Sequence, residues 1–382
     1  MVAATVEQSS CGPLHGKEPS DGKQNEPIIR HAAEMVRVEP SMKKPAMKTP
    51  AMKKPAMKTT ALCAVALGVS FTSVHAGLIT TDNFGSGGNA FSIQFAAVGN
   101  AGNANDAGAG GGSYSSPYGG VSYDYRMGVV EVSQDWITKA TSLGMSNVTA
   151  GAWSGSRPAA NMTWYEAAAF VNWLNTSKGH QAAYQLNGTN TALTLWTSGQ
   201  AWQAGGENLY RHKDAYYFLP NENEWYKAAY HKNDGVTANY WDYATGSNSI
   251  PDGIDFSGDT AFDAVFSQGF DQGSPNAVTN LGLASAYGTM GQNGNVWEWS
   301  ESAFDGINNS SSEFRAFRGG DWGGSGIGLR SSFRLDDSPS FESLNVGFRV
   351  ASVASVPEPS AAVFVFGLSL MCVLRRRRHS SL

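Results

Sequence analysis

The chain has 382 residues with 15% charged side chains, 44 Gly, eleven Trp, fourteen Tyr and eighteen Phe. This composition excludes an intrinsically disordered protein, which would be poor in aromatic residues and rich in charge, and it predicts a loop-rich globule with an aromatic core. The net charge of −5 is unevenly distributed, since residues 77–356 carry 13 Lys/Arg against 25 Asp/Glu, a balance of −12. Such an acidic body repels phosphate groups, so we exclude nucleic acid as a partner.

The first 76 residues have the features of an export signal rather than of a folded domain. Residues 1–56 are polar or repeat Met, Lys, Pro and Ala, and we expect a disordered, basic extension. Alternatively, they lie upstream of the true start, and translation begins at Met57 or a nearby Met. Residues 57–76 combine a basic start, an apolar stretch and the small residue Ala76, which is typical of a signal peptide that signal peptidase cleaves after Ala76.

Residues 77–119 are expected to lead into the domain, with an apolar segment at 91–95 followed by a Gly/Ala/Asn-rich loop. The alternation of apolar and polar residues at 121–132 predicts strands. Thr163 followed by Glu166 is a capping box, which predicts a helix at about residues 164–176.

Asn221 followed by Glu224 is a second capping box, and it predicts a short helix that ends at His231. His231 would then be a cation that interacts favourably with the negative end of the helix dipole, a role we prefer to metal ligation. Residues 232–290 are rich in Asn, Asp, Gly and Ser and are expected to form turns with aromatic residues between them.

The three cysteines, Cys11, Cys63 and Cys372, all lie outside residues 77–356. The expected mature domain therefore has no disulfide, no thiol nucleophile and no thiolate metal ligand. This excludes the catalytic and metal-binding classes that depend on thiols.

Residues 356–382 have three parts: a Pro-Glu-Pro triplet, a short apolar run at 361–374 and four consecutive arginines. The run is at the lower limit for a transmembrane helix, and the arginines favour a cytoplasmic C-terminus with the body outside. This arrangement resembles the PEP-CTERM sorting signal of Gram-negative bacteria. The residues that carry it are Pro357, Glu358, Pro359, Arg375, Arg376, Arg377 and Arg378.

The PEP-CTERM resemblance implies a substrate of an exosortase in the inner membrane, where the C-terminal segment anchors the chain transiently before sorting. It also implies release to the cell surface or the extracellular matrix. Cleavage near the Pro-Glu-Pro triplet is implied by the family.

Six segments of the body have the form and order of one known family. They are 125–132, 157–170, 219–229, 294–299, 318–322 and 347–350. Together they resemble the formylglycine-generating enzyme, or sulfatase-modifying factor, domain family over residues 120–355. The resemblance implies an α+β domain with an irregular, C-type-lectin-like fold, little regular secondary structure, small twisted antiparallel sheets and a few helices. The residues that mark this fold are Asn295, Trp297, Trp299, Arg318, Gly319, Gly320, Trp322, Gly347, Phe348 and Arg349.

The last part of the body contains four arginines that need acidic partners. We expect buried bidentate pairs with Asp321, Asp336 or Asp337, and the alternative is a groove that binds a carboxylate or sulfate. The arginines are Arg318, Arg330, Arg334 and Arg349.

In the oxidase members of the family, two cysteines after the Arg-Gly-Gly-x-Trp turn bind Cu(I), a soft ion that prefers thiolate ligands. The corresponding segment here, 323–334, contains no cysteine. Serine hydroxyls such as that of Ser325 are hard ligands and would not replace the thiolates. We therefore assign no catalytic residue and expect no copper.

Calcium is the cofactor that the resemblance implies, at the Gly-Asn-[VA]-Trp-Glu turn. Its ligands would be the carbonyl oxygens of Gly294 and Val296 and the carboxylate of Glu298, an oxygen-only set that suits Ca²⁺. Gly291 stands where the family usually has Asn or Asp, which removes one side-chain ligand. The alternative is that Glu298 bonds the backbone of its own turn.

These observations favour an exported, surface- or matrix-associated protein whose formylglycine-generating-enzyme-like domain is catalytically inactive. The domain would bind an extracellular polysaccharide, a peptide or another surface protein, or serve as a structural module. The alternative is a divergent oxidase that generates formylglycine on a protein cysteine, which the missing cysteines disfavour.

Overall fold

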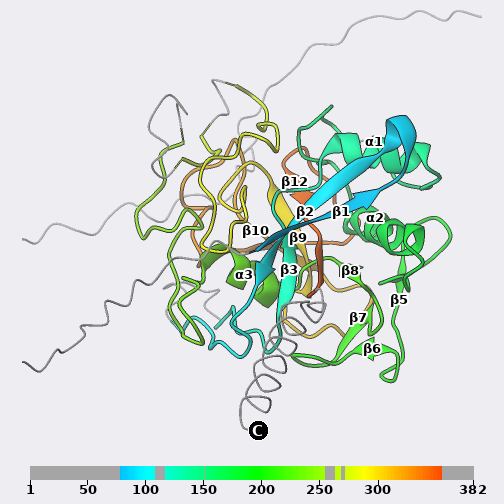
Figure 1. Cartoon of the computed structure of the whole chain (residues 1–382), viewed down its shortest axis with the longest axis horizontal. Coiled ribbons are helices and arrows are strands. Elements are labelled where there is room, and N and C mark those ends of the chain that lie inside the picture. Colours follow the sequence, from blue (N-terminus) through cyan, green and yellow to red (C-terminus); the bar gives the residue numbers. More distant parts are fainter. Residues whose placement is uncertain (1–77, 108–116, 150, 254–262, 268–271, 355–382) are drawn as a thin grey trace, which may run out of the picture. The chain divides into compact units, whose positions relative to one another are not determined.

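The computed structural model describes residues 78–107, 117–149, 151–253, 263–267 and 272–354 (Figure 1). The expected signal peptide and the PEP-CTERM tail lie outside these ranges. Within the described residues the chain forms four sheets, three α-helices and one 3-10 helix. The helices are α1 (Gln134–Ser142), α2 (Trp164–Ser177), α3 (Glu222–Tyr230) and the 3-10 helix η1 (Gly87–Asn89).

A five-stranded antiparallel sheet brings together strands from both ends of the described chain. Its order is β1-β2-β3-β13-β8, so the first two strands and the last one flank β3 (Figure 1). Much of the expected lead-in at 77–119 is thus in the same sheet as the body. The strands are β1 (Ile79–Phe84), β2 (Phe91–Val98), β3 (Tyr125–Gly128), β8 (Tyr217–Phe218) and β13 (Ala351–Val353).

A four-stranded sheet of order β11-β10-β9-β12 holds three of the segments that mark the fold. Strands β9 and β12 are parallel, with Phe348 opposite Trp299, and β10 is antiparallel to β9, with Phe317 opposite the same Trp299. The Trp-Glu-Trp, Arg-Gly-Gly and Gly-Phe-Arg motifs therefore meet in one sheet. The strands are β9 (Trp297–Ala303), β10 (Arg315–Arg318), β11 (Leu335–Asp337) and β12 (Val346–Phe348).

Two small antiparallel pairs complete the strands of the described chain. They are β4 (Gln185–Leu186) with β5 (Leu193–Thr194), and β6 (Ala201–Trp202) with β7 (Asn208–His212).

Both predicted capping boxes are confirmed. The Thr163 hydroxyl accepts the amide of Glu166 at 3.1 Å, and the Glu166 carboxylate accepts the amide of Thr163 at 2.9 Å. Asn221 and Glu224 make the same reciprocal pair, at 2.9 and 2.6 Å. Each box satisfies amides that would otherwise have no partner in the first turn, which fixes where α2 and α3 begin.

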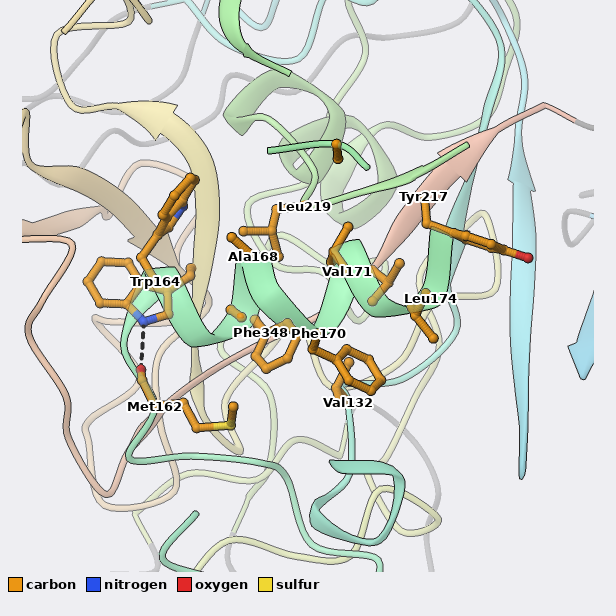
Figure 2. Close-up of a cluster of buried hydrophobic side chains, with 14 of the residues drawn as sticks. Val132, Met162, Trp164, Ala168, Phe170, Val171, Leu174, Tyr217, Leu219 and Phe348 are labelled. Carbon is orange, nitrogen blue, oxygen red and sulfur yellow. Dashed lines mark hydrogen bonds between the residues drawn. The ribbon is translucent and has the colours of Figure 1, made fainter. Parts of the chain in front are cut away.

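Helix α2 lies in the main hydrophobic core, and ten of its fourteen residues are buried. Figure 2 shows Phe170 and Trp164 of this helix beside Leu219 and Phe348. The Phe170 and Phe348 rings meet edge to face at 5.9 Å, and the Trp164 indole donates to the carbonyl of Ser300 at 3.0 Å. Large aromatic side chains with satisfied polar atoms thus fill the core where regular structure is sparse.

The α+β class with little regular secondary structure is confirmed. No named helix or strand occurs in the described part of 232–290, as expected. The strand predicted over 121–132 is shorter, because only Tyr125–Gly128 pairs with β2 and β13. Helix α1 was not predicted, although Ser133 caps it by accepting the amide of Trp136 at 3.4 Å. None of the helices in the described ranges is long and apolar enough to cross a membrane.

Candidate functional site

The glycine-rich turn before β9 has a backbone that few residues can adopt. Gly294 has a φ of 96° and Asn295 a φ of 62°, both in the left-handed region. A Cβ built at Gly294 would lie 2.1 Å from the carbonyl oxygen of Val265, so only glycine fits there. The Asn295 side chain accepts the amide of Asn276 at 2.8 Å and donates to Glu131 at 3.0 Å. Asn295 is therefore conformationally permissive and also anchors the turn.

Glu298, in β9 directly after this turn, and Arg349, directly after β12, form a fully buried ion pair. The Arg349 guanidinium donates to both carboxylate oxygens at 2.5 Å, and the Trp225 indole donates to one of them at 2.7 Å. Arg349 also donates to the carbonyls of Gly128 and Met290, at 2.9 and 2.8 Å. The alternative that Glu298 bonds the backbone of its own turn is wrong, because its oxygens instead accept from the charged guanidinium of Arg349 and from the neutral indole of Trp225.

Arg318 and Arg334 share one carboxylate, that of Glu222 at the start of α3. Arg318 donates to it at 2.6 Å, and Arg334 donates to both of its oxygens at 2.7 Å. The predicted partners of the arginines, Asp321, Asp336 and Asp337, were thus wrong for this pair. The two aspartates of β11 are half-exposed. Glu222, in contrast, is buried in contact with the buried guanidiniums of Arg318 and Arg334.

A third buried centre was not predicted at all. Arg211 on β7 lies between Glu224 of α3 and Glu301 of β9, with nitrogen–oxygen distances of 2.9 and 2.6 Å. None of these side chains is exposed to solvent. The three centres together fasten α3 to the four-stranded sheet, and their partners are too far apart in the sequence to be identified from spacing.

The remaining arginine of the four, Arg330, has an exposed side chain and donates to the hydroxyl of Tyr243 at 3.0 Å. An anion-binding groove built from all four arginines is therefore not assembled, because three of them are already paired with Glu222 or Glu298.

Glu298, one of the three predicted calcium ligands, already has a counter-ion, Arg349. Glu298 faces Arg349, whereas Oε2 of the nearby Glu131 is buried and has no hydrogen-bond partner among the described residues. Burial and the Glu298 carboxylate raise the pKa of Glu131 to about 8. A Cβ at Gly291 would lie 2.6 Å from this oxygen, so Glu131 occupies the space of a side chain at 291. Calcium at this turn stays a prediction.

The segment that follows the Arg-Gly-Gly-Asp-Trp turn contains both buried and exposed side chains. Leu329 is completely buried in a cluster with Tyr243, Ala264 and Phe266. Ile327 in the same segment is 56% exposed. Where the oxidase members carry thiolates, this segment thus supplies a core leucine and exposed aliphatic surface. No group of three or more His, Cys, Asp or Glu placed to hold a metal occurs in the ranges that the structure describes.

Two half-buried tryptophans lie together beside this segment. The rings of Trp153 and Trp322 are perpendicular with centroids 6.1 Å apart, and the Trp153 indole donates to the carbonyl of Leu344 at 2.8 Å. Leu344 is 52% exposed. Asn345 next to it donates to the Asp321 carboxylate, which connects residues 344–345 to the Arg-Gly-Gly-Asp-Trp turn. We use the name Trp322 surface for Trp153, Trp322 and Leu344, which these contacts join, together with the exposed Ile327 five positions after Trp322 in the sequence.

The sequence is similar to known families along most of its described length. A family model for the sulfatase-modifying factor enzyme 1-like domain matches residues 122–354, more than half of the 382 residues. A model for the PEP-CTERM protein-sorting motif matches residues 355–378 and indicates export and sorting in a Gram-negative bacterium. A search of curated proteins found no match.

Three solved structures are similar in fold. Treponema denticola variable protein 1 has 21% sequence identity and a TM-score of 0.50, and the match covers 72% of this chain and 99% of that chain. CarF has 20% identity and a TM-score of 0.45, covering 69% and 99%. PvdO from Pseudomonas aeruginosa has 14% identity and a TM-score of 0.44, covering 72% and 98%. Because the family model spans residues 122–354, the chain belongs to the sulfatase-modifying factor enzyme 1-like domain family.

Proposed function

We propose that this exported protein uses its domain to bind an extracellular ligand through the Trp322 surface, and that it does not oxidise a cysteine. The observation that carries the proposal is the segment 323–334, which has no thiol and places Leu329 in the core. A soft copper ion would find no thiolate there. The same segment exposes Ile327 and follows directly on Trp322, which pairs with Trp153, and exposed aliphatic and aromatic side chains are suited to contact.

The composition of this surface favours a peptide or a protein surface as the ligand over a polysaccharide. Its exposed residues are aliphatic, and the Trp153 indole N–H is already bonded to Leu344. A sugar site needs several free hydrogen-bond donors and acceptors, whereas an apolar patch with tryptophans is typical of protein contacts. Polysaccharide is the second candidate.

The test compares three single variants of the full chain on a peptide array and a glycan array. Trp153→Ala and Trp322→Ala should lose any signal that the wild type gives. Trp241→Ala is the matched control, because Trp241 is also half-buried but packs on Lys232, outside the Trp322 surface. Equal unfolding midpoints would show that the variants are folded. Binding that survives in Trp322→Ala, or a wild type that binds neither array, would contradict the proposal.

For export, we propose that signal peptidase cleaves after Ala76, that the C-terminal segment anchors the chain in the inner membrane, and that an exosortase then sorts it. The PEP-CTERM match at residues 355–378 supports the sorting step. Mass spectrometry of the protein from native cells should find Gly77 as the first residue and a C-terminus near Pro359. An intact C-terminal arginine cluster would contradict removal of the tail.

We retain calcium as a proposal for the turn before β9. The carbonyls of Gly294 and Val296, with the carboxylate of Glu298, remain the predicted ligands. The pKa of about 8 leaves the Glu131 carboxyl mostly protonated at neutral pH, and it would add negative charge to the site by losing its proton when calcium binds. Calcium should then raise the unfolding temperature relative to a chelator, and Glu131→Gln should reduce that rise. Identical melting curves with calcium and with chelator would contradict calcium binding.

A further inference from the structure

His231 is a buried residue directly after α3, and its ring is held on both nitrogens. Nδ1 lies 3.1 Å from the amide nitrogen of Asn233 and 2.9 Å from the hydroxyl of Tyr287. Nε2 lies 3.4 Å from the hydroxyl of Thr237. A backbone amide can only donate, so Nδ1 must be the unprotonated acceptor and Nε2 must carry the hydrogen. His231 is therefore a neutral imidazole in this arrangement.

The hydrogen bonds around this ring connect three segments that are distant in the sequence. The Tyr287 hydroxyl that donates to His231 also accepts from the side-chain amide of Asn100 at 3.0 Å. The same amide donates to the Asn233 side chain at 2.8 Å. Asn100 and Asn233 have φ values of 60° and 55°, a backbone conformation that needs such side-chain support. The segments after α3 and around residue 287 thus meet at one acceptor nitrogen, and Asn100, after β2, bonds the residues of both segments that contact it.

The surroundings of His231 oppose a positive charge on the ring. Burial and the ammonium of Lys227 lower its pKa, and Asp234 is the acidic group that acts in the other direction. The other titratable neighbours are Tyr240, which meets the ring edge to face at 5.0 Å, and Tyr287. The expectation that His231 is a cation at the helix end is therefore wrong at neutral pH, because its ring is buried and accepts two hydrogen bonds.

We propose that His231 is an acid-sensitive latch: a proton on Nδ1 removes the acceptor shared by Asn233 and Tyr287 and weakens the junction between the segment after α3 and the segment around residue 287. The added hydrogen would point at two groups that donate to the ring. The Asn233 amide would lose the Nδ1 acceptor. The tyrosine hydroxyl would have to turn its hydrogen away from the ring and accept from Nδ1 as well as from Asn100.

His212 provides a natural comparison within the same chain. Its Nδ1 also accepts the amide two residues later, that of Asp214, at 3.1 Å. Here, however, the Asp214 carboxylate lies 3.9 Å from Nδ1 and would neutralise a proton on the ring. Burial lowers the pKa of His212, and Asp214 opposes this shift. The same local geometry should thus respond to acid less strongly at His212 than at His231.

The sign of the effect follows from the lowered pKa. Unfolded histidine takes up its proton near pH 6.5, whereas His231 in the folded protein takes it up at lower pH. Stability from this group is complete above about pH 6.5 and is lost as pH falls towards the folded pKa, by up to about tenfold in the unfolding constant per pH unit.

Urea unfolding of the full chain from about pH 7.5 to about pH 5 tests the latch with matched variants. In His231→Asn the Oδ1 atom can take the place of Nδ1 and accept the same amide, but it does not titrate. The acid loss should be smaller in His231→Asn than in the wild type, and His212→Asn should keep most of it. Equal acid losses in the wild type and in His231→Asn would overturn the proposal.

A second measurement needs no variant and so does not depend on the folding of His231→Asn. Nitrogen-15 spectra of labelled histidine should show the Nε2–H tautomer for His231 at neutral pH. On acidification, the exchange of the Asn233 amide, corrected for its intrinsic pH dependence, should accelerate as the ring titrates. An Nδ1–H tautomer, or an Asn233 amide that stays protected when the ring is protonated, would overturn the latch.

Discussion

The buried arginine centres and the Trp322 surface are neighbours in the sequence but are built in opposite ways. At the buried centres, Arg318, Arg334 and Arg349 each meet a carboxylate at 2.7 Å or less. A few residues away, Ile327 and Leu344 are more than half exposed. The comparison shows that buried charge pairs hold α3 to the sheets, whereas Ile327 and Leu344 present aliphatic surface to solvent.

The largest effect should come from breaking the buried centre. Arg349→Met leaves the Glu298 carboxylate buried without a counter-ion, and we expect a loss of about 3–5 kcal/mol in the free energy of unfolding, measured in urea. The control is the double variant Glu298→Leu with Arg349→Met, which removes both charges and should recover a large part of the loss. A single variant as stable as the wild type would show that the pair does not hold the fold.

A smaller effect should separate two residues of the same segment. Leu329→Ala removes a completely buried side chain and should cost about 2–5 kcal/mol. Ile327→Ala, two residues earlier and 56% exposed, should change stability by only about 0.5 kcal/mol. Thermal and urea unfolding of both variants would check this, and equal losses would show that the segment is not divided into a core side and a surface side.

A loss smaller than that of Leu329→Ala is expected at the cap of α3. Asn221→Ala removes the acceptor for the Glu224 amide and should cost about 1 kcal/mol, whereas Asn221→Gly should cost only a few tenths. The helix start positions Glu222 and Glu224, so urea unfolding should show the loss in the whole domain. A larger loss in the glycine variant would mean that the backbone conformational entropy of residue 221, and not the capping hydrogen bond, determines the change in stability.

Local features of this fold could be predicted from the sequence. The capping boxes at Thr163 and Asn221 need only residues three positions apart, and both are where the pattern placed them. The motif segments also predicted the family, because glycine at positions such as Gly294 is required by the backbone itself. Helix α1 escaped prediction, since its cap by Ser133 lacks the reciprocal acidic residue of a capping box.

The partners of buried charges could not be predicted in the same way. Arg318 and Glu222 are 96 positions apart, and the aspartates nearer in the sequence offered a simpler pairing. The ion pair of Arg211 with Glu224 could not be inferred from the sequence, because capping of α3 was already a sufficient explanation for Glu224. His231 was misjudged for a related reason: position at a helix end predicts a cation, but burial and the Asn233 amide make the ring a neutral acceptor.

The most direct test of the central claim, that this family member retains the fold without the oxidase chemistry, uses a cysteine-containing peptide. The full chain is incubated with copper, oxygen and a reductant, and the peptide mass is followed. We predict that the peptide stays unchanged and that oxygen uptake matches a control without protein. Conversion of the peptide cysteine to formylglycine would contradict the claim.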